Sequence, residues 1–369
     1  MSTLKVEFIR IDNIQPHPNA DRLEIATVKG WQCVVPKGQF IAGDAAVYFP
    51  IDSILPEKLE SSLFPPESKI KLNKSRVRTI KLRGVISQGI LETKAELFEN
   101  GFLSHYSYCF GEDLTKELGV TKYEPPKGKV QTHGLQASKK QSNPFFHKYT
   151  DIENFKNYPN LFTDEDRVVV TEKVHGTNFR AGWVPFYPHT LWQRLKRRFG
   201  FGQKWQFVYG SHKVQLQDRW LYNGYYDKDV YSEAVSKYNL TTKIPLGFVI
   251  YGEIYGSCIQ KGYTYECKAG ERKLVVMDIM YGNDYLNHNQ AEVLAQYWGL
   301  PFVPVLYRGY YDRKLMETLV CGNSILTPFQ EIREGIVIKS EAEQKCQIGR
   351  KILKLKSDEF LLRTEDDTH

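Results

Sequence analysis

Residues 1 to 120 consist of short apolar–polar alternations separated by turn residues. The candidate strands are KVEFIRI, LEIATV, CVVP, AAVYFP and GVISQGILET, and the segments HPNAD, PKG and AGD lie between them. Many short strands with frequent turn signals are typical of a small β-barrel. We therefore predict a β-barrel module over residues 1–120.

The pattern changes twice after this module. Residues 121–148 are rich in proline, glycine, serine and lysine, which is typical of a linker with little core of its own. Over residues 149–369, strand patterns alternate with helical ones such as NQAEVLAQYWG. A chain of 369 residues favours two domains over one core. We predict a basic linker at 121–148 and one α+β domain at 149–369.

Composition narrows the class of protein. Apolar residues make up 41% and charged residues 25% of the chain, as in globular proteins. No stretch approaches the roughly 20 apolar residues of a membrane span, and the first residues lack a signal-peptide core. We expect a cytoplasmic protein with no membrane partner. The six cysteines are scattered without a C-x-x-C pair, which favours buried free thiols over a zinc site.

The excess of basic residues is concentrated in clusters. The net charge is +7, and the segments KSRVRTIKLR, LWQRLKRRFGFGQKW and KGKVQTHGLQASKK contain no acid. Basic clusters interleaved with aromatics suit a phosphate backbone, and the alternative is solvated surface. In the first cluster we expect Lys74, Arg76 and Arg78 to share one side of a strand. With Arg83 they are the candidate nucleic-acid contacts.

One lysine stands in an unusual place. Lys173 closes the β-branched run VVVTEK, and Gly176 follows three residues later. A lysine attacks phosphorus only as a neutral amine, which partial burial and neighbouring cations favour. Gly176 would let the backbone and a phosphate approach closely. Alone, this pattern also fits an ordinary surface lysine.

Other strings supply the partners that a nucleophilic lysine needs. VIYGEIYG places Glu253 on a strand, and EGIVIK places Glu334 at the start of another. In ILKLK, alternation projects Lys354 and Lys356 to one face. Carboxylates for a ribose and a divalent metal, with paired lysines for phosphate, indicate nucleotidyl transfer.

The ordered strings EKVHGTN, YGEIYG, VVMDIM, EGIVIK and KLK resemble the motifs of the covalent nucleotidyltransferase superfamily of DNA ligases, RNA ligases and mRNA capping enzymes. KVHGTN resembles the motif of RNA ligases more closely than that of DNA ligases, and HKYTDIEN resembles the opening of nick-sealing RNA ligase domains of the bacteriophage type. IDNIQPHPNADRLEIATV and IKLRGVISQGILET resemble OB-fold tRNA-binding modules. The whole resembles the Deinococcus-type nick-sealing RNA ligases. This resemblance implies an α+β chain in which an N-terminal OB-fold β-barrel precedes an antiparallel-sheet nucleotidyltransferase domain.

The resemblance also implies residue roles. Lys173 would accept the nucleotide, Glu334 would serve a metal, and Lys354 and Lys356 would contact the α-phosphate. The implied ATP contacts are Glu172, Gly176, Asn178, Glu253, which also assists the metal, Met277, and His212 or Lys213. Two of these depart from the family pattern. Met277 stands at a base-stacking position that is commonly aromatic, and His212 or Lys213 stands where phage-type enzymes carry an arginine.

The implied activity is that of an ATP-dependent RNA ligase that uses Mg²⁺ (or Mn²⁺). It would seal 3′-OH/5′-phosphate breaks through a lysyl-AMP intermediate and a 5′-adenylated end. The expected partner is a nicked RNA or RNA/DNA duplex, and we expect a monomer. A DNA ligase or a capping enzyme is one alternative, although these usually carry a further C-terminal OB domain and only 13 residues follow Lys356. A catalytically inactive RNA-binding relative is another.

Overall fold

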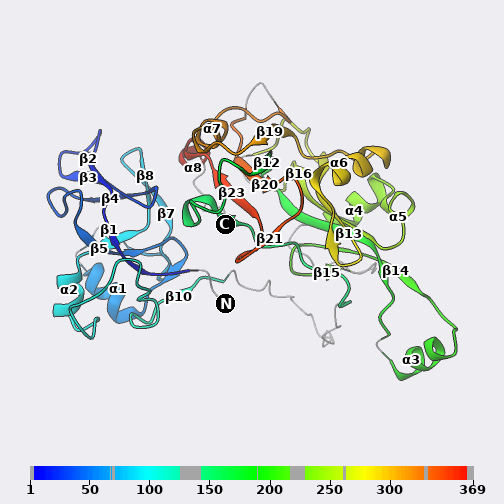
Figure 1. Ribbon diagram of the computed structural model, residues 1–369, viewed down its shortest axis with the longest axis horizontal. Helices are drawn as coiled ribbons and strands as arrows, with labels where there is room; N and C mark the ends of the chain where they lie inside the picture. Colours follow the sequence, from blue (N-terminus) through cyan, green and yellow to red (C-terminus); the bar gives the residue numbers. More distant parts are fainter. Residues whose placement is uncertain are drawn as a thin grey trace. The chain divides into compact units, whose positions relative to one another are not determined.

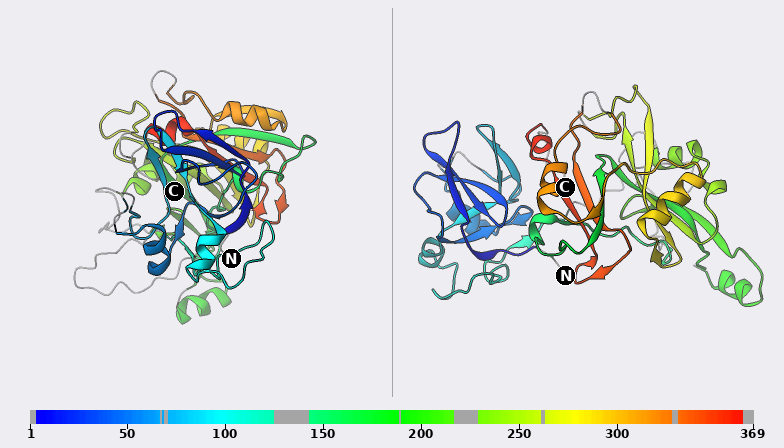
Figure 2. Two further views of the ribbon diagram at one scale, coloured as in Figure 1. Left: turned by 90° about the vertical axis from the view of Figure 1, so that its left-hand side faces the viewer. Right: turned by 45° about the horizontal axis from the view of Figure 1, so that its top comes forward.

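A computed structural model describes residues 4–66, 68, 71–124, 143–188, 190–216, 229–260, 263–327 and 331–363. The chain divides into two compact units, which we describe separately (Figures 1 and 2). Unit 1 comprises residues 1–127 with 361–369, and unit 2 comprises residues 128–360. The predicted linker and its basic cluster fall mostly outside the described residues, so the bounds of the linker stay a prediction.

Unit 1 is built of short antiparallel strands, as the alternating pattern predicts. The sheets have the strand orders β2-β3-β4, β1-β5-β9 and β7-β8. Val34 N donates to Ser87 Oγ at 3.0 Å, which joins β4 to β8. Apolar side chains of the strands fill the interior. The elements are β1 (Glu7–Arg10), β2 (Asn13–Pro16), β3 (Leu23–Val28), β4 (Trp31–Pro36), β5 (Ala45–Phe49), β6 (Ser53–Ile54), α1 (Glu57–Leu63), β7 (Thr79–Leu82), β8 (Val85–Gln88), β9 (Ile90–Glu92), α2 (Lys94–Glu99) and β10 (Thr121–Lys122).

The expectation that Lys74, Arg76 and Arg78 share one side of a strand is wrong. Lys74 and Ser75 have φ angles of 56° and 57° and form a turn, which interrupts the period-2 alternation that the expectation needed. Arg76 is buried instead of facing solvent. The regular strand begins only at β7.

Unit 2 contains two large sheets and the two-stranded sheet β21-β22, and the predicted site lies where the chain passes from β12 of one large sheet to β13 of the other. Among the described residues, sheet 1 has the order β11-β23-β20-β12-β19, and sheet 2 the order β15-β14-β13-β16-β17-β18. The pairing is antiparallel except between β11 and β23. The strands are β11 (Glu153–Asn154), β12 (Arg167–Lys173), β13 (Thr177–Pro185), β14 (Trp205–Gly210), β15 (Gln215–Leu216), β16 (Phe248–Gly256), β17 (Arg272–Tyr281), β18 (Asp284–Tyr285), β19 (Val305–Tyr310), β20 (Gly335–Ser340), β21 (Lys345–Cys346), β22 (Gly349–Arg350) and β23 (Ile352–Lys356).

Helices cover one face of each sheet. An apolar core lies between sheet 2 and α4, α5 and α6, and a second core lies between sheet 1, η1 and α7. Helix α3 takes no part in either core and stands at the tip of the β13–β14 hairpin (Figure 1). The helices of unit 2 are η1 (Phe155–Asn157), α3 (Leu191–Arg198), α4 (Val230–Lys237), α5 (Leu240–Lys243), α6 (His288–Tyr297) and α7 (Arg313–Leu319). Helix α8 (Asp358–Arg363) begins in unit 2, and its last three residues belong to unit 1. None of the helices in the described ranges is long and apolar enough to cross a membrane.

Strand alternation separates core residues from polar ones. In β12, β20 and β23, every second residue enters the core of sheet 1, and the intervening positions place Lys173, Lys339, Lys354 and Lys356 on the opposite face. In sheet 2, Phe179 and Ile250 enter the helix-covered core. The other face carries Asn178 and Glu253 together with an apolar cluster that includes Val249 and Tyr251. The α+β fold with mostly antiparallel sheets confirms the predicted fold class.

The prediction of buried thiols is wrong for four of the six cysteines. All six are free, but only Cys33 and Cys267 are buried. The other four are the exposed Cys109, Cys258 and Cys321 and the half-buried Cys346. The spacing of the cysteines along the chain carries no information on their burial.

Candidate active site

Lys173 lies where the chain passes from one sheet to the other. It is the last residue of β12 in sheet 1, and β13 of sheet 2 begins four residues later at Thr177. The β-branched run before Lys173 is buried in sheet 1. The Lys173 side chain is 21% exposed, so solvent can reach it. The sequence places the lysine at the end of a strand because the chain changes sheets there.

Three basic side chains lie close to the carboxylate of Glu334. Its Oε2 lies 2.6 Å from Lys173 Nζ and 3.6 Å from His175 Nδ1, and its Oε1 lies 3.2 Å from Lys356 Nζ. The strand register explains this arrangement, because Lys173 pairs with Gly335 and Gly335 pairs with Lys356. Burial raises the pKa of Glu334, but Lys173 and Lys356 outweigh it and hold this pKa well below its usual range. The carboxylate is therefore ionised and orients both lysines.

Lys354 lies two residues before Lys356 on the same face of β23. Burial, with the nearby positive charges of Lys173 and Lys356, lowers the pKa of Lys354 to about 8. Three amines thus share a confined region around one carboxylate. Such a concentration of positive charge suits the phosphates of a nucleotide.

Glu253 and Asn178 form the wall of the site on sheet 2. They are directly paired across β13 and β16. Burial raises the pKa of Glu253 to about 8, although Lys173 opposes the shift. Asn178 Oδ1 is buried and has no hydrogen-bond partner among the described residues. A half-buried carboxyl and an orphaned amide oxygen are the groups that a bound ribose or metal would satisfy.

Gly176 is needed for a reason that differs from the predicted one. A Cβ at this position would lie 2.2 Å from the carbonyl oxygen of Ile254 and 2.9 Å from Cγ of Glu253. The glycine therefore allows β13 to approach β16, and this contact seats Glu253 beside Lys173. Close approach to a phosphate remains a prediction.

Glu172 lies on β12 directly before Lys173, and Met277 lies on β17 of sheet 2. Glu172 is buried, and its carboxylate accepts from Ser324 Oγ at 2.5 Å and from Ile325 N at 2.8 Å. Burial raises the pKa of Glu172. Met277 is half-buried in β17, and its carbonyl accepts from Lys339 Nζ at 3.3 Å. Their expected contacts with adenosine stay predictions.

Arg180 of β13 contacts the segment around His212 and Lys213, the two residues expected to replace a family arginine. His212 Nε2 lies 3.2 Å from Asp151 Oδ1, and burial lowers the pKa of His212 although Asp151 opposes it. Lys213 is exposed. Behind them, Arg180 is 2% exposed and donates to the carbonyl oxygens of Ser211 at 2.9 Å and Phe146 at 2.7 Å. Sequence reasoning missed Arg180, although its place two residues after Asn178 on a strand was a usable signal.

A buried ionic cluster links the two sheets and was also missed. Asp278 of sheet 2 accepts from Lys339 Nζ of sheet 1 at 2.6 Å, from Arg350 at 3.0 Å and from the Tyr149 hydroxyl at 2.6 Å. Arg350 also pairs with Glu343 at 2.6 Å. Burial raises the pKa of Asp278, but Arg350 and Lys339 outweigh it and depress this pKa strongly. The cluster fixes the spacing of the two polar sheet faces.

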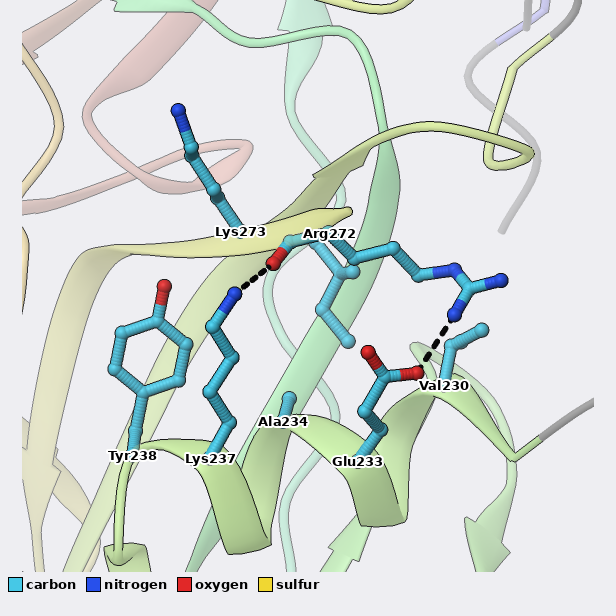
Figure 3. Close-up of a pocket in the computed structure, with 8 residues that line it drawn as sticks. Val230, Glu233, Ala234, Lys237, Tyr238, Arg272 and Lys273 are labelled. Carbon is cyan, nitrogen blue, oxygen red and sulfur yellow. Dashed lines mark hydrogen bonds and ion pairs between the residues drawn. The ribbon is translucent and has the colours of Figure 1, made fainter. Parts of the chain in front are cut away.

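A small hollow beside α4 is not part of this site. It has a volume of only about 10 Å³, roughly the space of one water molecule. Glu233 and Lys237 occupy its rim, the first in an ion pair with Arg272 at 2.6 Å and the second in a hydrogen bond to the Arg272 carbonyl (Figure 3). This hollow cannot admit a nucleotide.

The four predicted nucleic-acid residues of unit 1 have different environments. Arg76 pairs with Asp52 at 2.6 Å and lies 3.7 Å from the ring centroid of Tyr123, so its guanidinium stabilises the unit. Lys74 and Arg83 are exposed, and Arg78 is half-buried. Lys74, Arg78 and Arg83 thus remain candidates for phosphate contacts, and Arg76 does not.

The donor set fits a divalent cation held jointly with phosphates. No group of three histidine, cysteine, aspartate or glutamate residues is gathered for a metal within the described part of the chain. Mg²⁺ usually keeps several waters and takes one or two carboxylates together with substrate phosphates. Glu253 and Glu334 influence each other electrostatically and could provide those two carboxylates.

Comparisons with known proteins agree with this geometry. Structures of the RNA ligase of Naegleria gruberi resemble the chain along its length. A mutant with AMP and Mn aligns with a TM-score of 0.70 and 22% identity over 99% of each chain. A mutant with ATP and Mn gives 0.68 and 23% over 98% of this chain and 100% of that one. The complex with PPi gives 0.66 and 23% over 98% of each. At these identities the likeness shows the fold.

Family models carry the assignment further. A model described as an OB-fold domain matches residues 5–93. The RNA ligase model matches residues 166–356, which is more than half of the chain and includes every motif from Lys173 to Lys356. The chain therefore belongs to the RNA ligase family. No curated protein sequence matches it.

Proposed function

We propose that the protein is an ATP-dependent RNA ligase that works through a lysyl-AMP intermediate on Lys173. The observation that carries this proposal is the arrangement of Lys173 and Lys356 around one ionised carboxylate, with Glu253 and Asn178 opposite. The family membership, and the ATP or AMP present in the similar Naegleria structures, support ATP as the nucleotide.

In the first step, the neutral amine of Lys173 attacks the α-phosphorus of ATP. A P–N bond forms, the bond to pyrophosphate breaks, and the amine releases a proton to solvent. Glu334 holds Lys173 Nζ in place at 2.6 Å, and Lys354 and Lys356 stabilise the charge that develops on the phosphate oxygens. Fixed neighbours of this kind need no rearrangement during the reaction, which lowers the barrier.

The remaining contacts would hold the nucleotide. Asn178 Oδ1 can accept a hydrogen bond from the ribose, because it has no partner among the described residues. Mg²⁺ (or Mn²⁺) would neutralise charge on the phosphates, held by Glu253 and Glu334. Glu172 and Met277 would lie toward the adenosine.

In the later steps, the AMP passes from Lys173 to a 5′-phosphate, and a 3′-OH then displaces it. We propose that the substrate is a nick in a duplex whose 3′-OH strand is RNA, and that a single chain suffices because the described site residues come from one chain. Lys213 or His212 would meet the 5′-phosphate. In unit 1, Lys74, Arg78 and Arg83 would contact phosphates of the duplex by charge and shape.

The test is labelling with α-³²P-ATP and magnesium. The wild type should form an acid-labile, base-stable lysyl-AMP, and Lys173→Ala should form none. Lys356→Ala should label weakly, and Lys314→Ala, an exposed lysine on α7, should label like the wild type. An unlabelled wild type, or a labelled Lys173→Ala, would sink the proposal. Equal labelling from GTP would favour a capping enzyme.

A panel of nicked duplexes defines the polymer. RNA or DNA is placed on each side of the nick, and single strands are included. Sealing only with an RNA 3′-OH strand is the expected result. Sealing of all-DNA nicks at the same rate would favour a DNA ligase, and RNA binding without any adenylation would favour an inactive relative.

A further inference from the structure

Helix α3 contains no buried residue and belongs to a projecting segment that we call the arm, residues 185–188 and 190–205. Both views show it at the end of the β13–β14 hairpin, away from the two sheets (Figures 1 and 2). The helix begins at a capping box made by Thr190 and Gln193, and it contains no buried residue. A helix this short is marginally stable by itself and gains little burial here, so its whole surface is available to a partner.

The arm presents large apolar side chains to solvent. The exposed fractions are 82% for Leu191, 72% for Trp192, 46% for Leu195, 67% for Phe199 and 71% for Phe201. Exposed apolar groups gathered in one place are typical of interaction sites. Three of the five are aromatic.

The charge of the arm is entirely positive. No aspartate or glutamate occurs between Glu172 and Asp218. Arg194, Lys196 and Arg198 are exposed on α3. A partner that covers this surface must therefore be anionic.

Beneath the helix, an open cavity of about 390 Å³ combines both features. Arg197, Phe201, Lys204 and Trp205 line it, together with the backbone of two glycines. Arg197 Nη1 donates to the Phe186 carbonyl at 2.9 Å, which fixes the helix to its stem. The volume lies in the range of small-ligand sites, and cations beside aromatic rings suit a phosphate and a base.

The arm is continuous with the active site. Strand β13 carries Asn178 near its start and reaches the arm at Pro185. Seven residues at about 3.3 Å each correspond to roughly 23 Å. At the 3.4 Å per nucleotide of a B-form strand, that distance corresponds to about seven nucleotides. It reaches the base of the arm, where Pro185 and Trp205 line the cavity.

We propose that the arm binds the RNA substrate about seven nucleotides from the break, with phosphates on Arg194, Lys196 and Arg198 and an unpaired base in the cavity against Phe201 and Trp205. The proposal rests on the proposed function for the identity of the polymer. Charge complementarity and continuity with the nucleotide site favour RNA over an anionic lipid surface, which the helix alone would also fit.

The experiment measures RNA affinity by fluorescence anisotropy over a range of salt concentrations, without ATP. The probe is a nicked RNA duplex with an unpaired extension that begins beyond about seven nucleotides from the nick. Lys196→Glu and Arg198→Glu should each weaken binding and reduce the magnitude of the salt slope by about 0.7 to 0.9. Phe201→Ala should weaken binding roughly 5- to 150-fold with an unchanged salt slope.

Controls keep the outcome decisive. Lys314→Glu reverses an exposed lysine on α7 of the same unit and should leave RNA affinity unchanged. Melting curves verify that each variant is folded, which is expected because α3 buries nothing. RNA affinity is measured without ATP and lysyl-AMP formation without RNA, so the two proposals fail separately.

Two results would overturn the inference. One is an RNA affinity in Lys196→Glu, Arg198→Glu and Phe201→Ala equal to that of the wild type. The other is a vesicle result: the wild type sediments with vesicles of phosphatidylserine and phosphatidylcholine, and the three substitutions abolish this sedimentation without changing RNA affinity. The second result would assign the arm to a lipid surface.

Discussion

Replacing Asp278 by asparagine tests whether the ionic cluster holds the two sheets together. The carboxylate is 1% exposed, and its two cationic partners, Lys339 and Arg350, are 5% and 7% exposed. The variant leaves Lys339 without its counter-ion, while Arg350 keeps Glu343. Removing one partner of a buried pair costs about 3–5 kcal/mol of the free energy of unfolding. For a unit of this size, each kcal/mol lowers Tm by about 2–4 °C, so we expect a fall of roughly 6–20 °C.

The assay is thermal unfolding followed by circular dichroism. Glu341→Gln is the matched control, because Glu341 follows β20 directly and pairs with the exposed Arg167 at 2.7 Å. A surface pair of that kind contributes at most about 1 kcal/mol. Adding Lys339→Met to Asp278→Asn should recover part of the loss, because it removes the uncompensated charge. The reasoning is refuted if Asp278→Asn costs no more than Glu341→Gln.

The pH dependence provides a second check. The pKa of Asp278 is depressed in the folded protein, so its contribution is present above the pKa of the unfolded chain, about 3.9. This contribution is lost only as the pH falls through the folded value. The difference in unfolding free energy between the wild type and Asp278→Asn should therefore be constant from about pH 5 to 8. A difference that disappears by about pH 6 would contradict the assignment.

Three further predictions concern the active site. Burial raises the pKa of Glu253 to about 8, and a carboxylate must be ionised to bind a metal. The affinity for Mn²⁺ in the presence of ATP, measured by titration calorimetry, should therefore rise about fivefold from pH 7 to pH 8. Glu253→Gln should remove this pH dependence. Gly176→Ala places a Cβ 2.2 Å from the Ile254 carbonyl, so chemical denaturation should show a loss of about 1–3 kcal/mol, and lysyl-AMP labelling should fall. Arg180→Met removes the donor to the Ser211 carbonyl, and we expect this hydrogen bond to position the neighbouring His212. In nick-sealing assays, sealing should therefore fall by up to about a hundredfold more than lysyl-AMP formation. Equal losses in the two reactions would reject a positioning role for Arg180.

Much of the fold follows from local pattern. The strand around Glu253, the strand that carries Lys354 and Lys356, and helix α6 were predicted from periodicity, because alternation and the 3.6-residue repeat are properties of neighbouring residues. The positions of Lys173 at a strand end and Glu334 before a strand were predicted in the same way. For residues 74–78 the prediction of a strand was wrong, because Lys74 and Ser75 have positive φ angles and the chain turns there.

The sequence by itself determined the chemical inventory: a lysine, two carboxylates and two further lysines in a recognisable order. Only the tertiary structure decided which groups meet. Glu334 lies 161 residues from Lys173, and strand register alone brings their side chains to 2.6 Å. The partners of Asp278, the carbonyls held by Arg180 and the burial of Arg76 depend likewise on long-range packing. Local periodicity carries no information on such contacts, because they are fixed by which strands pair and which sheet faces oppose one another.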